Sequence, residues 1–118
     1  MAKYLVLIYG NERTWESERP AWHEANAARH QALIASASSS ILGVNELEST
    51  TKAVSIRAGA AGKPLVTDGP FLETKEIVGG YYLLEAADVQ EAIRLASQIP
   101  EATASHGGVE IRAIVAAG

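Results

Sequence analysis

The sequence contains no cysteine, which excludes disulfide bonds, thiolate zinc sites and a cysteine nucleophile. It has no cluster of basic residues either, and the net charge at pH 7 is −4. Nucleic-acid binding requires neutralisation of phosphates, so this balance argues against nucleic acid as a partner. Long hydrophobic runs are also absent, because the apolar run at the N-terminus extends only from Tyr4 to Tyr9. That is too short for a signal peptide or a membrane span, and we expect a cytoplasmic protein that does not contact a membrane.

The length and composition are those of one globular domain. A chain of 118 residues is too short for two ordinary domains. Hydrophobic residues make up 47% and charged residues 20%, which is close to the averages for folded proteins and excludes disorder. We therefore predict a single domain over residues 1–118.

The first part of the chain predicts a strand, a helix and a second strand. Residues 4–9 are continuously apolar and rich in β-formers, which is typical of a strand buried on both faces. A helical pattern follows from about residue 18 to residue 38, with Pro20 in its first turn, and residues 41–47 form the second strand. The helix face that should point toward a sheet carries Trp22, Asn26, His30, Leu33 and Ala37.

A β-hairpin and a further strand are predicted in the middle of the chain. Residues 53–57 and 64–67 are the two arms of the hairpin. The strand at 78–84 is apolar on both faces. Its paired glycines, Gly79 and Gly80, indicate a bulge or a close approach of another group to the backbone.

The second helix has a clear start and a clear end. Asp88 is a suitable N-cap, Glu91 follows it as in a capping box, and Pro100 closes the segment. Residues 109–113 then alternate between apolar and polar side chains, as expected for a half-exposed or edge strand.

The order β-α-β-hairpin-β-α-β is the ferredoxin-like arrangement of an α+β protein, with an extra β-hairpin. It places the first and third main strands at the centre of the sheet and the last strand at an edge. Two helices cover only one face of such a sheet, whereas alternate apolar residues of the central strands lie on the other face. A second copy packed sheet to sheet would bury those residues, so we predict a homodimer.

The segment from Val66 to Glu76, followed by Gly79-Gly80-Tyr81-Tyr82-Leu83, resembles the signature of the YCII-related family. The turn Asp68-Gly69-Pro70-Phe71 points specifically to the DGPF-domain branch, and the resemblance covers nearly the whole chain. Only residues 38–40 depart from the pattern, where three serines replace a charged helix end with its closing glycine. The resemblance implies a dimeric α/β-barrel, a bacterial origin and a mostly uncharacterised function. Some family members carry a His–Asp pair in a cleft, proposed as a catalytic dyad, and others occur beside or fused to extracytoplasmic-function sigma factors.

Asp68 and His30 are the candidate catalytic residues. Asp68 begins a turn that Pro70 stiffens, and its carboxylate either caps that turn or shares a proton with a partner. His30 lies in the middle of the sheet-facing helix surface, where it is either a satisfied core residue or that partner. If the two are close, as the family's His–Asp pair implies, Asp68 fixes the tautomer of His30 and raises its basicity. The pair is then a general acid/base near neutral pH.

Three more residues are candidates for ligand binding. His106 lies in a loop and is the weaker alternative partner for Asp68. Tyr81 and Tyr82 point to opposite faces of the sheet, and the Tyr82 hydroxyl either donates to a ligand or is satisfied in the core. Arg112 points outward from its strand and is suited to an anionic ligand.

We predict no metal ion and no cofactor. His23 and His30 lie two helical turns apart, too far to bind one ion, and the sequence has no phosphate-binding loop or dinucleotide fingerprint. Two functions stay open. In the first, the protein is a small-molecule enzyme in which Asp68 orients His30 within a pocket between helix and sheet. In the second, it is a ligand-binding or regulatory module associated with a sigma factor, and the same pocket senses a ligand.

Overall fold

The computed structural model describes residues 1–116, and it contains the strands, the hairpin and both helices that the sequence predicts. It adds a short helix, α1, and three 3₁₀ turns. In chain order the strands and helices are β1 (Ala2–Asn11), α1 (Glu12–Ser17), α2 (Pro20–Ser36), β2 (Ile41–Glu46), β3 (Val54–Ala58), β4 (Pro64–Asp68), β5 (Glu76–Ala86), α3 (Val89–Ala96) and β6 (Gly107–Ala113). The 3₁₀ turns are η1 (Thr50–Lys52), η2 (Ala60–Gly62) and η3 (Pro100–Thr103).

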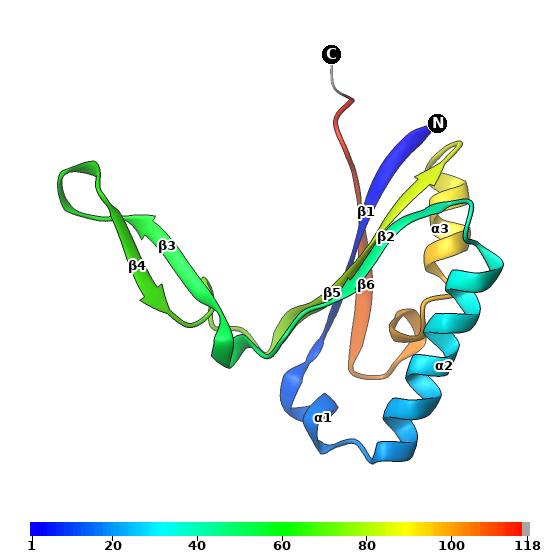
Figure 1. The fold of residues 1–118 in the computed structure, drawn as a ribbon, viewed down its shortest axis with the longest axis horizontal. Coiled ribbons are helices and arrows are strands. Elements are labelled where there is room, and N and C mark those ends of the chain that lie inside the picture. The colour runs from blue at the N-terminus through cyan, green and yellow to red at the C-terminus, as the bar shows by residue number, and fades with distance from the viewer. Residues whose placement is uncertain (117–118) are drawn as a thin grey trace.

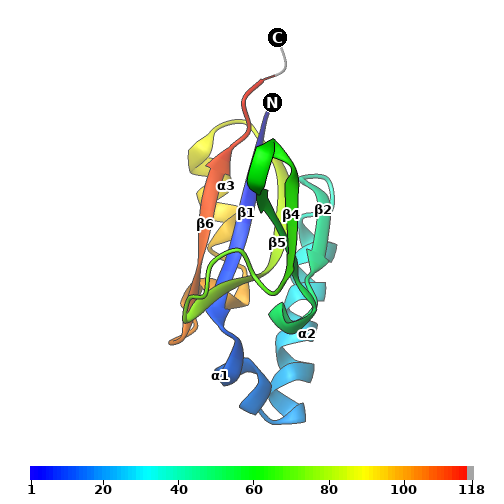
Figure 2. The same ribbon diagram turned by 90° about the vertical axis from the view of Figure 1, so that its left-hand side faces the viewer.

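Four of the strands form an antiparallel sheet in the order β2-β5-β1-β6. Because β5 lies between β1 and β2 and is antiparallel to both, the fold is the ferredoxin-like type of α+β structure. The predicted central places of the first and third main strands are confirmed, as is the edge position of β6. Figure 1 shows that α2 and α3 lie on the same side of this sheet, and Figure 2 shows its opposite face without a covering helix.

The hydrophobic core lies between the sheet and these two helices. Along β1, Tyr4, Val6 and Ile8 are buried toward the helices, while Leu5 and Leu7 are half-buried on the opposite face. This alternation follows from the strand pleat, which sends successive side chains to opposite faces. β5 repeats it, with Tyr82 and Leu84 fully buried and Tyr81 on the opposite face. The helices contribute Leu33, Ala92, Leu95 and Ala96 to the same cluster.

Each helix begins where local hydrogen bonding favours it. The Asp88 side chain accepts a bond of 2.9 Å from the backbone N–H of Glu91, as the predicted N-cap requires. Pro20 occupies the first turn of α2, and Asn11 caps α1 through the backbone N–H of Thr14. Within residues 1–116, no helix combines the length and hydrophobicity needed to cross a lipid bilayer.

Strands β3 and β4 pair only with each other and project from the main sheet as an arm (Figure 1). We call residues 54–68 the hairpin arm. The arm makes the molecule extended: its radius of gyration is 16.3 Å, against about 13.5 Å for a compact chain of this length. An isolated two-stranded hairpin is only marginally stable in water. This one nevertheless exposes Val54, Ile56, Leu65 and Val66.

Candidate functional site

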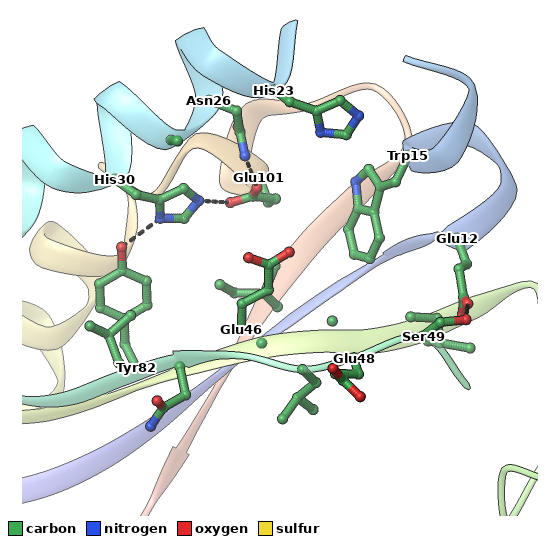
Figure 3. Close-up of a pocket in the computed structure, with 18 of the residues that line it drawn as sticks. Glu12, Trp15, His23, Asn26, His30, Glu46, Glu48, Ser49, Tyr82 and Glu101 are labelled. Carbon is green, nitrogen blue, oxygen red and sulfur yellow. Dashed lines mark hydrogen bonds and ion pairs between the residues drawn. The ribbon is translucent and has the colours of Figure 1, made fainter. Parts of the chain in front are cut away.

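A pocket of about 670 Å³ lies between α2 and one end of the sheet (Figure 3). Its walls come from α1, α2, the end of β2 with the residues that follow it, the beginning of β5, and η3. This volume is within the range of small-molecule binding sites. The helix face that the sequence predicts to face the sheet therefore forms one wall of a cavity as well as part of the core.

His30 is held in this wall by contacts to both of its ring nitrogens (Figure 3). Nδ1 lies 2.5 Å from the Tyr82 hydroxyl, and Nε2 lies 2.7 Å from Oε1 of Glu101. The His30 and Tyr82 rings are also stacked, with centroids 5.8 Å apart. A histidine with both nitrogens engaged cannot change its ring orientation without breaking one contact.

Glu101 is the charged end of this arrangement. It is only 6% exposed, and its second oxygen, Oε2, accepts a hydrogen bond of 2.9 Å from the Asn26 amide. Burial acts to raise the pKa of Glu101, but the interactions with His30 and Asn26 outweigh it and hold this pKa below its ordinary value. The side chain is therefore a buried carboxylate at neutral pH.

Tyr82 is the neutral end. Burial, with a smaller effect from the charge of Glu101, raises the pKa of Tyr82 to about 12. The phenol therefore keeps its proton at neutral pH. Because the ionised Glu101 can only accept a hydrogen bond, the proton of a neutral His30 belongs on Nε2, and Nδ1 then accepts from the Tyr82 hydroxyl. The result is an ordered chain of phenol, imidazole and carboxylate.

The indole of Trp15 lies against the backbone of β1 and β5 at one side of the pocket. A Cβ atom added to Gly10 or Gly79 would come within 2.0 or 2.5 Å of this ring. Gly79 is also the extra residue where the β1–β5 register shifts between Ile8 and Tyr9. The close backbone approach and the bulge that the paired glycines indicate are both confirmed, and the group that approaches is Trp15.

Glu12 fixes the rim of the pocket. Its carboxylate accepts hydrogen bonds from the hydroxyls of Ser49 and Thr50, at 2.5 and 2.7 Å, and from the backbone N–H of Thr50. These bonds hold the pKa of Glu12 below its ordinary value, and the hydroxyls of Ser49 and Thr50 contribute most to this. The carboxylate thus ties the segment after β2 to α1.

The comparison with known proteins agrees with the family resemblance of the sequence motif. Residues 2–117 match the family model of the YCII-related domain. The chain belongs to the YCII-related family. An uncharacterised protein from Rhizobium meliloti (strain 1021) is 35% identical to it over 115 residues, which cover 92% of this chain and 89% of that protein. Neither comparison assigns a reaction or a ligand to this YCII-related protein.

The turn Asp68-Gly69-Pro70-Phe71 begins at the end of the hairpin arm and does not line the pocket. Asp68 is the last residue of β4 and is exposed. Within residues 1–116 its side chain makes no hydrogen bond and no ion pair, so it does not cap the turn. Ser55 instead donates to the Gly69 carbonyl at 2.6 Å, and Gly69 has the positive φ of 106° that favours glycine. Within one chain the carboxylate next to His30 is therefore that of Glu101 and not that of Asp68, and a catalytic role of Asp68 stays a prediction.

The other two candidate residues lie outside the pocket. His106 does not line it; its ring lies 6.1 Å from that of Trp22, centroid to centroid, and its Nε2 lies 4.0 Å from Oε1 of Glu18. Arg112 lies on β6 opposite Leu5 and is exposed on the face of the sheet without helices. Their roles in ligand binding stay predictions.

Glu101 and Asn26 are the site residues that sequence reasoning did not single out as chemical groups. Asn26 lies one turn before His30 on a helix face that is otherwise apolar, and two polar residues so placed indicate a buried hydrogen-bond network. Glu101 follows Pro100 in a 3₁₀ turn and has no comparable signal. Among residues 1–116 no group of three or more acidic or histidine side chains is arranged to hold a metal ion.

Proposed function

We propose that this YCII-related protein is a small-molecule enzyme that uses His30 as a general acid/base. The observation that supports this most is the chain Glu101–His30–Tyr82 in the wall of a pocket of ligand size. It replaces the His30–Asp68 pair with a histidine–glutamate pair of the same chemical kind. The DGPF-type turn supports placing the protein in that branch of the family.

Each member of the chain has a different task in this proposal. Glu101 is a positioning residue, because its carboxylate fixes the orientation of the imidazole and compensates positive charge on it. The His30 side chain is 19% exposed and is the group that faces the ligand. A ligand competes with the neutral Tyr82 hydroxyl for Nδ1, since the carboxylate holds Nε2 more strongly. His30 accepts a proton from one ligand atom, becomes an imidazolium beside Glu101, and returns the proton to another.

Hydrogen exchange in D₂O tests this proposal without knowledge of the natural substrate. A panel of small ketones, lactones and amino ketones is incubated with the protein, and loss of C–H signals is followed by proton NMR. We expect exchange of at least one compound, slowed by about 100-fold or more in His30→Gln. His23→Gln is the matched control, because His23 lines the same pocket without joining the chain. Exchange that persists in His30→Gln, or none with the wild-type protein, contradicts the proposal.

A ligand-binding or regulatory module is the second candidate. It is favoured by the limited access to the Glu101–His30–Tyr82 network. Tyr82 is fully buried and Glu101 nearly so, and both His30 nitrogens are already in contact with these two side chains. In this function a bound ligand would change the packing around the network and not undergo a reaction. Saturable binding of a compound that undergoes no exchange and no chemical change would favour this function, and association with a sigma factor belongs to it.

We also propose that two copies form a homodimer of the dimeric α/β-barrel type. The half-buried face of the sheet and the apolar hairpin arm support it, since both present hydrophobic side chains that nothing in one chain covers within residues 1–116. In that assembly the arm of one protomer lies against its partner.

A further inference from the structure

The walls of the pocket carry a strongly one-sided set of charges. Five glutamates line it, and among the residues described no lysine or arginine does. Its only basic side chains are His23 and His30. An anionic ligand entering this space meets repulsion that no lysine or arginine of the pocket wall offsets, whereas a cation is attracted.

The glutamates differ in what their carboxylates already contact. Glu12 is bonded to Ser49 and Thr50, and Glu48 lies 3.4 Å from Lys52. Glu101 is buried behind His30, so its charge acts on the cavity with little screening by water. The carboxylate of Glu16, in α1, makes no hydrogen bond or ion pair within residues 1–116, and neither does that of Glu46, which is exposed at the end of β2. Figure 3 shows the Glu46 carboxylate pointing into the pocket.

An aromatic surface lies in the same cavity as this free carboxylate. The indole of Trp15 is pressed onto the backbone at Gly10 and Gly79, and Trp22 lines the pocket from α2. Tryptophan is the side chain whose ring binds cations best, through the negative charge of its π-face. An aromatic surface and an unpaired carboxylate that line one cavity are a combination suited to organic cations.

We propose that the pocket takes a small organic cation, an alkyl- or arylammonium, with its charge at Glu46 and its apolar body against Trp15. This inference rests on the proposed function, since it assigns a ligand class to the pocket that contains His30. The cavity of about 670 Å³ holds such a molecule with room for its body to reach the His30 side of the pocket.

Three ligands of similar shape and different charge test the proposal: phenethylammonium, 2-phenylethanol and phenylacetate. Both tryptophans of the chain line the pocket, so titrations followed by tryptophan fluorescence report directly on it. We expect saturable binding of the ammonium ion, at least about tenfold tighter than that of phenylacetate. We also expect this affinity to fall as salt is added.

Glu46→Gln should weaken phenethylammonium binding by about tenfold and leave 2-phenylethanol unaffected. Glu24→Gln is the matched control, because Glu24 is exposed on the same helix as His30 but does not line the pocket. Equal or tighter binding of phenylacetate overturns the cation proposal. An unchanged affinity of Glu46→Gln for phenethylammonium overturns it as well. If hydrogen exchange still depends on His30 in that case, the acid/base function stands without this ligand class. If the wild-type protein shows neither phenethylammonium binding nor hydrogen exchange, both the ligand class and the acid/base function are refuted.

Discussion

At the scale of single residues, Glu101 is the charge on which the buried chain depends. Its pKa is lower in the folded protein than the ordinary value of 4.5. The ionised carboxylate therefore stabilises the fold above that ordinary value, and the stabilisation is lost as the pH falls through the lowered pKa. The polar network at His30 should thus weaken in acid before the rest of the core does.

Replacing Glu101 with glutamine tests this at two pH values. We expect Glu101→Gln to lower the free energy of unfolding by about 2 kcal/mol at pH 7, because His30 and Asn26 lose a charged partner. At a second, acidic pH below the lowered pKa of Glu101, the difference from wild type should shrink, because the wild-type carboxylate is protonated there as well. Urea unfolding at fixed protein concentration measures both values. Glu24→Gln, on an exposed site, should change neither, and an equal loss at both pH values would contradict the argument.

The same residues show what sequence alone could predict about the site. The helix spacing places His30 toward the sheet, and strand alternation turns Tyr82 to the same side, so two members of the chain are predictable. Glu101 is not, because its contact with Asn26 joins residues 75 positions apart and depends on how η3 packs beneath α2. The turn motif makes Asp68 a candidate site residue. It does not predict the direction in which the hairpin that carries Asp68 projects from the sheet.

At the scale of elements, the bulge in β5 and the short helix α1 form one unit. α1 places Trp15 over the sheet, and the glycines of β1 and β5 leave room for its ring. Periodicity could not reveal α1, since six residues make fewer than two turns. The paired glycines did indicate that something approaches the backbone there.

An alanine at Gly79 should disturb this unit. The added Cβ would lie 2.5 Å from the Trp15 ring, so the indole must move away from the sheet. We expect Gly79→Ala to cost about 1–3 kcal/mol of stability and to shift the tryptophan emission to longer wavelength. Gly108→Ala is the control, because a Cβ at that strand position meets no atom within 4 Å. Similar behaviour of the two variants would show that Trp15 does not depend on Gly79.

At the scale of the whole molecule, one chain is too extended to bury its own apolar surface. Its accessible surface is 8059 Å², whereas a compact monomer of this mass exposes about 6,200 Å². The excess of about 1,900 Å² per chain exceeds the roughly 800 Å² that each partner buries in a standard interface. The flat dimensions, 49 × 46 × 19 Å, agree with a molecule that offers one broad face to a partner.

If a second copy binds to that face, the molecular mass in solution should be that of a dimer. Light scattering at micromolar concentration should give about 25 kDa, twice the 12.5 kDa of one chain. Val66→Glu places a charge on the exposed apolar surface of the hairpin arm and should shift the mass toward that of one chain, because an unpaired charge is costly in an interface. Ile93→Glu, at a similarly exposed site on α3, should leave the dimer intact. Circular dichroism establishes that both variants are folded. A wild-type mass of one chain would refute the dimer, and dissociation by Ile93→Glu alone would place the interface on the helical side.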